Sequence, residues 1–226
     1  FADVVLVLRE GRVDAFGPPD EVLEPGRIAR VFGVTARRIT DGDAEAWAAQ
    51  QVPDDRPVLL INPCSSHPAR NWRAERYAEV ADYATAERGM RIVLSGGPSE
   101  LEKQTGESIE KSMKSPCINL VGKDTLEQSK ALLKRADLVI TPDSGPAHVA
   151  SALGTPVIGL HAATWSRRSG PYNSLDLCVD RFAEAALRYR KKPAEELRWG
   201  TRIEVPGVMD LVETGEVIER IHRAGF

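Results

Sequence analysis

The chain has 226 residues, of which 42% are hydrophobic and 28% charged, enough apolar material for one sizeable core. Its net charge of −3 and isoelectric point near 5.9 give no reason to expect a nucleic acid or an anionic membrane as partner. No apolar run is long enough to span a bilayer, and the run at 4–8 is too short for a signal peptide, so we expect a cytoplasmic protein. Cys64, Cys117 and Cys178 are far apart and fit buried thiols in a reducing compartment.

The first 34 residues predict a hairpin followed by a short helix. Apolar runs at 4–8 and 13–16 flank a polar turn, and residues 17–20 are typical of a helix start. The stretch FADVVLVLREGRVDAFGPPDEVLEPGRIARVFGV resembles the C-terminal tail of an ABC-transporter ATPase subunit of the haem or siderophore import type. The chain contains no GxxxxGK[ST] loop, so ATP hydrolysis is not expected. A junction between unrelated genes and a hairpin used for packing both explain this segment.

Residues 40–55 are polar and acidic, with an Ala-rich helical piece at 44–50, and are interpreted as a linker. We therefore expect two parts. The first is an N-terminal extension with its linker at 1–52, and the second is a larger domain at 53–226.

The larger domain alternates between strands and helices. Apolar runs predict strands at 57–62, 91–94, 118–121, 138–140, from 156 onward and at 175–179. Helical periodicity predicts helices at 73–88, 100–113, 126–134, 147–153, 181–192 and 210–224. This alternation is typical of an α/β fold, a Rossmann-like doubly wound parallel sheet covered on both faces. Ligands of such sheets bind at the carboxyl ends of the strands, so we expect four loops to share one rim, at 63–72, 95–100, 141–148 and 161–172.

The loop TPDSGPAH, after the predicted strand at 138–140, has the residues of an anion site. Pro146 fits the first turn of a helix, and Asp143 or Ser144 can cap it. The unpaired N–H groups of such a helix attract an anion, and Gly145 lets a phosphate approach the backbone. His148, near the start of the helix, can point toward the same ligand. The alternative is that Asp143 and Ser144 only cap the helix and that His148 is an ordinary surface histidine.

Two hydroxyls and a cation follow the first strand of the domain. Ser65, Ser66 and Arg70 supply the groups that a diphosphate needs. The alternative is a pair of loop hydroxyls beside a solvated charge. Glu100 begins a helix, where the helix dipole alone favours a carboxylate, and it can also accept a hydrogen bond from a ribose or sugar hydroxyl.

Two further segments are cationic. Arg167 and Arg168 follow the predicted strand that begins at 156, and form either a candidate anion site or a solvated turn. Arg188, Lys191 and Lys192 share one face of the predicted helix at 181–192. Because the dipole favours cations in a last turn, we interpret them as a solvated basic end rather than an anion site.

Four motifs, in this order and spacing, carry a resemblance to a known family. NPCSSHPARNW, GGPSE, TPDSGPAHVASALGTPVIGL and RRSGPY resemble the C-terminal domain of glycosyltransferase family 9, the ADP-heptose:lipopolysaccharide heptosyltransferases. The resemblance covers about residues 53–226. It implies the C-terminal half of a GT-B architecture, in which this domain binds the nucleotide-sugar donor and an N-terminal domain holds the acceptor.

The resemblance also implies a role for each matching residue. Ser65 and Ser66 contact the donor diphosphate, Arg70 is the basic residue beside it, and Glu100 binds the nucleoside side. The loop that holds the diphosphate and the sugar is matched by Asp143, Ser144, Gly145 and His148.

The reaction implied is inverting transfer of heptose from ADP-heptose to the lipopolysaccharide inner core, in the cytoplasm at the inner-membrane surface. No metal or other cofactor is expected. The general base of the family is an aspartate of the N-terminal domain, so we expect this chain to be the donor-binding half, with no catalytic residue of its own. The alternative is a non-catalytic nucleotide-binding or interaction module. A Rossmann dehydrogenase is disfavoured because no GxGxxG follows the first strand.

Overall fold

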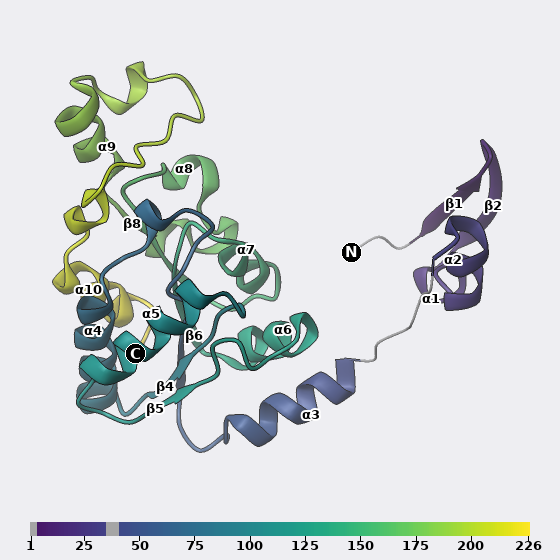
Figure 1. The fold of residues 1–226 in the computed structure, drawn as a ribbon, viewed down its shortest axis with the longest axis horizontal. Helices are drawn as coiled ribbons and strands as arrows, with labels where there is room; N and C mark the ends of the chain where they lie inside the picture. Colours follow the sequence, from purple (N-terminus) through teal and green to yellow (C-terminus); the bar gives the residue numbers. More distant parts are fainter. Residues whose placement is uncertain (1–3, 35–40) are drawn as a thin grey trace. The chain divides into compact units, whose positions relative to one another are not determined.

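The computed structural model describes residues 4–34 and 41–226, which belong to two compact units, Phe1–Asp41 and Gly42–Phe226 (Figure 1). In the first unit, β1 (Val5–Arg9) and β2 (Arg12–Gly17) form an antiparallel hairpin. Two short helices follow, α1 (Pro19–Val22) and α2 (Pro25–Phe32). The predicted hairpin and helix are therefore present within the described residues.

The second unit is built on a parallel sheet of six strands in the order β5-β4-β3-β6-β7-β8. The strands are β3 (Val58–Ile61), β4 (Arg91–Leu94), β5 (Cys117–Asn119), β6 (Leu138–Pro142), β7 (Val157–His161) and β8 (Val179–Asp180). This order confirms the predicted doubly wound sheet. The direction of winding reverses between β3 and β6, and the crevice at such a reversal is where ligands of α/β sheets bind.

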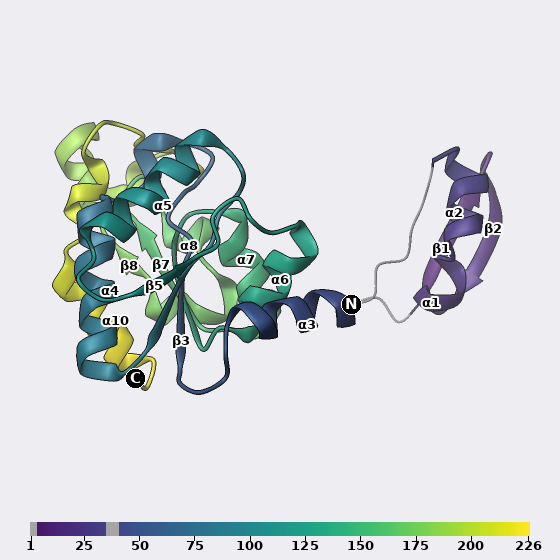
Figure 2. The same ribbon diagram turned by 60° about the horizontal axis from the view of Figure 1, so that its bottom comes forward.

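Helices cover both faces of this sheet (Figure 2). They are α3 (Asp41–Gln51), α4 (Ala74–Arg88), α5 (Glu100–Ser112), α6 (Leu126–Arg135), α7 (Gly145–Ala152), α8 (Ser166–Ser169), α9 (Phe182–Ala185) and α10 (Thr214–Arg223). Along β3, Leu59 and Ile61 pack with α4, α5 and α10, whereas Val58 and Leu60 pack with α3, α6 and α7. Both faces of the strand are buried, which explains its continuous apolar sequence. Within the described residues, no helix has the length and apolar character needed to cross a membrane.

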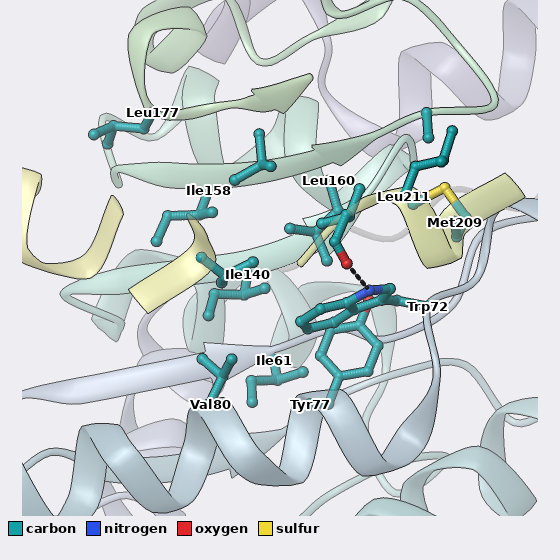
Figure 3. Close-up of a cluster of buried hydrophobic side chains, with 14 of the residues drawn as sticks. Ile61, Trp72, Tyr77, Val80, Ile140, Ile158, Leu160, Leu177, Met209 and Leu211 are labelled. Atoms are coloured by element: carbon teal, nitrogen blue, oxygen red, sulfur yellow. Dashed lines mark hydrogen bonds between the residues drawn. The ribbon is translucent and has the colours of Figure 1, made fainter. Parts of the chain in front are cut away.

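The core ties the first loop of the rim to the C-terminal part of the chain (Figure 3). The indole Nε1 of Trp72 donates a hydrogen bond to the carbonyl of Val212 over 3.0 Å. Its ring meets the ring of Tyr77 edge to face, with centroids 5.0 Å apart. The loop that ends at Trp72 is therefore held at a fixed position above the sheet.

The helix α3 lies in the second unit, although the sequence analysis assigned residues 1–52 to an extension and linker. Ala44, Ala48 and Val52 are buried against the sheet residues Val58 and Leu60. This burial of apolar surface makes α3 part of the second unit, which begins at Gly42.

The predicted strand at 175–179 is wrong for most of its length. Residues Tyr172–Leu177 form a 3₁₀ turn, η2, and only Val179–Asp180 pair with β7. The physical reason is a side chain, because the Ser174 hydroxyl accepts the backbone N–H of Val157 and holds this segment out of the sheet.

The predicted helices at 181–192 and 210–224 are shorter than expected. The first divides into α9 and a π-helical turn, η3 (Ala186–Arg190), which ends at Lys191 in the left-handed region with φ of 56°. The last helix begins at Thr214, where the Glu216 carboxylate accepts the backbone N–H of Glu213 at 3.2 Å, and a 3₁₀ turn, η5 (Val208–Leu211), precedes it. Two more 3₁₀ turns are η1 (Pro68–Arg70) and η4 (Ala194–Glu196).

Candidate functional site

A cavity of about 520 Å³ opens at the carboxyl ends of β3, β4, β5 and β6, where the order of the strands reverses. Three of the four predicted rim loops line it, those after β3, β4 and β6, whereas the fourth lining loop follows β5 and the predicted loop at 161–172 does not take part. The lining residues are Asn62, Cys64, Ser65, Ser66, Gly96, Gly97, Pro98, Ser99, Leu101, Glu102, Asp124, Thr125, Leu126, Ser129, Ser144, Gly145 and Pro146. Four of the predicted site residues are thus brought together, namely Ser65, Ser66, Ser144 and Gly145.

One wall of the cavity is set by Glu102 in the first turn of α5. Its carboxylate accepts the backbone N–H of Gly97 at 2.8 Å and the hydroxyl of Ser99 at 2.5 Å. A Cβ on Gly97 would lie 2.8 Å from Glu102 Oε2, so the close approach of this carboxylate needs glycine there. The sequence analysis missed Glu102. The spacing Ser99-x-x-Glu102, which is typical of a helix cap, was the signal that could have found it.

A second carboxylate, Asp124, lies on the wall beside α6. Burial raises the pKa of Asp124, against the lowering effect of hydrogen bonds from its own backbone N–H and from the Ser129 hydroxyl. Its Oδ2 is buried and has no hydrogen-bond partner among the described residues. Asp124 and Glu102 give the cavity two acceptors for the hydroxyl or amino groups of a ligand.

The N-terminus of α7 opens on the cavity without a side-chain cap. Ser144 is the residue that precedes the helix, but its hydroxyl bonds to the hydroxyl of Thr141 at 2.8 Å and not to the helix. Asp143 points to other partners, so the interpretation that both residues only cap the helix is wrong. Gly145 has open space beside it, since a Cβ there would meet nothing within 4 Å. The first N–H groups of α7 remain available to an anion.

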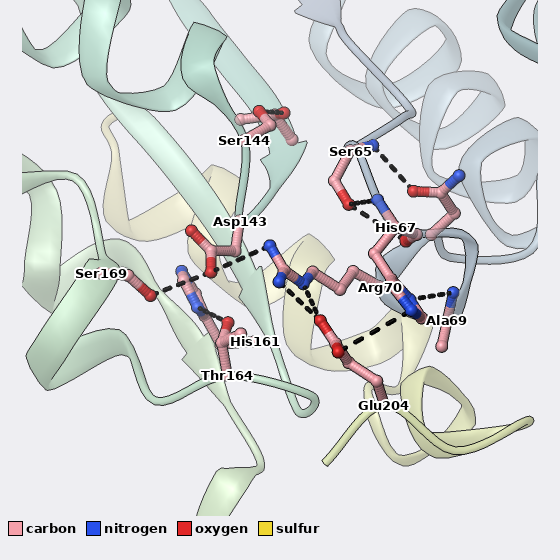
Figure 4. A network of polar contacts seen from close by, with 12 residues as sticks. Ser65, His67, Ala69, Arg70, Asp143, Ser144, His161, Thr164, Ser169 and Glu204 are labelled. Atoms are coloured by element: carbon pink, nitrogen blue, oxygen red, sulfur yellow. Dashed lines mark hydrogen bonds and ion pairs between the residues drawn. The ribbon is translucent and has the colours of Figure 1, made fainter. Parts of the chain in front are cut away.

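Beside the cavity lies a group of charged side chains that we call the Arg70 cluster, consisting of Arg70, Asp143, Ser169 and Glu204 (Figure 4). Glu204 Oε1 accepts from Arg70 Nε at 2.8 Å and from Nη2 at 2.5 Å. The third guanidinium nitrogen, Nη1, is 3.9 Å from Asp143 Oδ2, which also accepts the Ser169 hydroxyl at 3.0 Å. Arg70 is buried, so the interpretation of a solvated charge is wrong for it.

The Arg70 cluster holds one cation between two carboxylates. Burying a guanidinium is costly unless it is paired and hydrogen-bonded, and both conditions are met here. Glu204 was missed by the sequence analysis, because it lies 134 residues from Arg70 and no local pattern marks it. Only the packing of the segment before η5 against the loop of η1 brings it to the site.

The hydroxyl of Ser65 is committed to its own loop. It donates to the carbonyl of His67 and accepts the N–H of His67, both at 3.2 Å, and the Ser65 N–H bonds to Asn71 Oδ1 (Figure 4). Ser66 is exposed at the edge of the cavity. The loop is therefore folded by its own polar groups, while Ser66 stays accessible to a ligand.

A buried histidine, His161, ends β7 next to the Arg70 cluster. Burial lowers the pKa of His161, against the opposite effect of Asp180 and Asp143. Its Nδ1 lies 3.3 Å from the hydroxyl of Thr164, and its Nε2 has no partner within the described part of the chain. The lowered pKa favours a neutral ring at neutral pH.

The structure does not bring the other predicted residues to the cavity. Glu100 is exposed and accepts a hydrogen bond from Gln104, and His148 is exposed on α7. Arg167 lies over the Trp165 ring, 5.3 Å from its centroid, and neither it nor Arg168 lines the cavity. Across residues 4–34 and 41–226, no group of three or more His, Cys, Asp or Glu could hold a metal ion. That the donor binds without a metal stays a prediction.

Comparison with known proteins identifies the family. The model of glycosyltransferase family 9 (heptosyltransferase) matches residues 35–199. The lipopolysaccharide core heptosyltransferase OpsX of Haemophilus influenzae is 37% identical over 184 residues, which cover 81% of this chain and 53% of OpsX. A solved family 9 glycosyltransferase from Veillonella parvula is 25% identical with a TM-score of 0.62, over 80% of this chain and 51% of that one.

A further solved structure, E. coli heptosyltransferase WaaC with ADP, is 16% identical with a TM-score of 0.53, and covers 88% of this chain and 55% of WaaC. This likeness shows the fold alone, and the predicted half of a GT-B architecture is confirmed by these neighbours. The chain spans about half the length of the curated relatives named here. The family match begins at residue 35, so the resemblance of 1–34 to an ABC-transporter ATPase tail stays a prediction.

Proposed function

Because the chain belongs to glycosyltransferase family 9, the heptosyltransferases, we propose that its cavity binds the ADP-sugar donor of a transferase of lipopolysaccharide core synthesis. One observation carries the proposal. A cavity large enough for a nucleotide lies at the reversal of the strand order and combines an uncapped helix N-terminus with hydroxyls and two carboxylates.

The positions of the donor groups follow from the chemistry of the lining. The diphosphate is proposed to lie at Gly145 and the first turn of α7, within reach of Ser66. The nucleoside is proposed to lie between α5 and α6, where Glu102 and Asp124 accept hydrogen bonds from ribose hydroxyls or the base amino group. The choice of ADP is supported by WaaC, a fold relative solved with ADP.

The Arg70 cluster is proposed to lie where the diphosphate meets the sugar. Sugar hydroxyls are donors that suit Asp143 and Glu204, and the guanidinium of Arg70 offers fixed N–H groups to a phosphate oxygen. Negative charge grows on the leaving diphosphate as the bond to the anomeric carbon breaks. Donors fixed beforehand at this point, from Arg70 and α7, stabilise the transition state more than the ground state.

The acceptor proposed is the lipopolysaccharide core, with inversion at the anomeric carbon, in the cytoplasm at the inner-membrane surface. The attacking hydroxyl must lose a proton, so a general base is required. None of the residues described above is assigned to that step, and the chain is proposed to provide the donor-binding part of the enzyme.

Calorimetric titration with ADP and ADP-heptose tests the proposal. We expect binding in the micromolar range for the unmodified chain. Gly145→Ala places a methyl group in open space at the proposed phosphate position, so the fold is kept and the affinity falls at least about tenfold.

Gly215→Ala is the matched control, because a Cβ there also meets nothing within 4 Å but lies on α10, away from the cavity lining. Its affinity should equal that of the unmodified chain. A folded chain that takes up neither ligand, or equal affinities for all three proteins, would contradict the proposal.

A further inference from the structure

The segment 187–202 is strongly basic in a chain that is acidic as a whole. It contains six Lys or Arg and two Glu, a net charge of +4, while the whole chain carries −3 and the remainder therefore −7. The six cations are Arg188, Arg190, Lys191, Lys192, Arg198 and Arg202. A charge of this sign on one short segment can attract an anionic partner that the net charge of the chain conceals.

The segment follows the edge strand β8 and is anchored to the domain in its middle and just beyond its C-terminal end. Figure 1 shows it in yellow-green beside α9, at one end of the second unit. Ala194 is buried, and the N–H of buried Ile203 donates to the carbonyl of Ala163 at 2.8 Å. Arg190 Nη2 donates to the carbonyl of Arg202 at 3.1 Å and closes the segment on itself. Its shape is therefore fixed by packing and hydrogen bonds.

The six cations are exposed and not neutralised. Within the residues that the structure describes, none of them forms an ion pair with a carboxylate, whereas nearby Arg181 pairs with Glu184 and Glu216. Arg188 instead lies over the ring of Tyr189, 5.5 Å from its centroid. The positive charge is thus presented to the surroundings.

Two large apolar side chains are exposed among these cations. Trp199 is 67% exposed and Leu187 is 57% exposed. The ring of Trp199 lies 6.1 Å from that of Trp165, which carries Arg167 above it. Arg168 also approaches, because its Cδ would be 4.0 Å from a Cβ on Gly200. We call the segment 187–202 with Arg167 and Arg168 the basic surface.

We propose that the basic surface docks on the anionic face of a phospholipid bilayer. Exposed Lys and Arg are attracted to lipid phosphates, and an exposed tryptophan and leucine between them suit the headgroup layer, where the indole is both apolar and a hydrogen-bond donor. The basic surface carries +6, with Arg167 and Arg168 included, and the rest of the chain therefore −9, which an anionic bilayer repels, so the basic surface is the face that turns toward it.

A duplex nucleic acid is a weaker fit to the same surface. Its phosphates would satisfy the cations, but an exposed leucine gains nothing from a phosphate backbone, whereas it can enter the boundary between headgroups and acyl chains. None of these residues lines the cavity, so the inference does not depend on the donor site; it rests on the proposed function only for the location at the inner-membrane surface, and names the face that would make the contact.

Co-sedimentation with vesicles tests the proposal. We expect the full chain to bind vesicles of phosphatidylcholine with one quarter phosphatidylglycerol, and not vesicles of phosphatidylcholine alone, with binding that weakens as salt is added. Each Lys or Arg near such a surface contributes about fivefold in affinity. The variant K191Q/K192Q/R198Q/R202Q should therefore bind at least about 100-fold more weakly.

The matched control is K103Q/K111Q/K114Q/K123Q, which removes the same charge from exposed lysines of α5 and the turns that follow α5 and β5. This control should bind the vesicles nearly as well as the unmodified chain. Anionic vesicles should also shift the tryptophan fluorescence of the unmodified chain to shorter wavelength, but not that of Trp199→Ala. No uptake by the anionic vesicles, equal loss in both quadruple variants, or binding to duplex DNA without binding to vesicles would overturn the proposal. ADP titration of both variants keeps this test separate from that of the donor site.

Discussion

The cavity and the Arg70 cluster lie next to each other but are built in opposite ways. The cavity is shaped by contacts within single loops, such as Gly97 with Glu102 and Thr141 with Ser144. The cluster joins Arg70 and Glu204 across 134 residues of sequence. Local patterns therefore determine where a ligand enters, and long-range packing determines which charges it meets.

The two regions also differ in charge. The cavity lining contains hydroxyls and two carboxylates and, among the described residues, no cation. The cluster contains a buried cation whose charge is already balanced by Glu204 and Asp143. An uncharged nucleoside suits the first region, and the second offers oriented donors and acceptors rather than a free positive charge. Substitutions in one region should therefore leave the other intact.

The largest effect is expected from Arg70→Met, which breaks the cluster. It leaves the carboxylates of Asp143 and Glu204 close together, poorly exposed and without their cation. Because removal of one partner of a buried pair leaves an uncompensated charge, we expect the free energy of unfolding to fall by about 2–3 kcal/mol, as measured by urea denaturation.

Arg73→Met is the control for this prediction. Arg73 also makes a two-point contact with a carboxylate, that of Asp210, but its side chain is 63% exposed. A solvated pair of this kind contributes less than about 1 kcal/mol. Equal losses in the two variants would mean that the Arg70 cluster is no more than a surface ion pair.

The difference between local contacts and long-range packing explains which features could be predicted from the sequence. The strand at Arg91–Leu94 was predicted with its observed bounds, and the helices α4, α5 and α6 within one residue at each end, because their apolar periods and turn residues are local signals. The cavity residues Ser144 and Gly145 were found for the same reason. Their roles in binding stay predictions.

Two of the failures have long-range causes. Leu175 and Leu177 give a strand-like pattern, but the bond from Val157 to the Ser174 hydroxyl holds this segment in a turn. Glu204 has no neighbour in sequence that marks it as a partner of Arg70. Contacts between distant segments carry no signature in a single sequence, so both features could be seen only in the fold.

Gly97→Ala tests the hydrogen bond that holds the Glu102 wall of the cavity. The added Cβ displaces the Glu102 carboxylate from the Gly97 N–H and leaves this donor without its partner. We expect a loss of about 1 kcal/mol in the free energy of unfolding and a weaker affinity for ADP.

Gly42→Ala adds the same methyl group in open space on α3 and is the control. It should match the unmodified chain in ADP affinity and be no less stable, since alanine favours the helix. If Gly97→Ala were as stable as this control, the hydrogen bond from the Gly97 N–H to Glu102 would not stabilise the cavity wall.

The smallest effect is expected from substitution of Asp124, the second cavity carboxylate, and this substitution should raise the free energy of unfolding rather than lower it. Burial raises the pKa of Asp124, so the folded state holds this proton more tightly than the unfolded chain, and stability is lost as the pH rises above the ordinary value of 3.8. Asp124→Asn removes that cost and should be more stable than the unmodified chain at pH 7, by well under about 1 kcal/mol because solvent screens this partly exposed group, with little difference at pH 4.

The matched comparison for Asp124 is Asp210→Asn. The hydrogen bond from Arg73 lowers the pKa of Asp210, so this carboxylate contributes stability that is present at pH 7 and lost as the pH falls through its folded-state pKa. At pH 7 the urea midpoint should therefore rise for Asp124→Asn and fall for Asp210→Asn, whereas at pH 4 the difference for Asp124→Asn should disappear. If both variants lost stability at pH 7, the surroundings of Asp124 would stabilise its carboxylate. The carboxylate in the cavity wall would then not lower the stability of the folded chain. Ready acceptors on that wall are what the donor-site proposal requires.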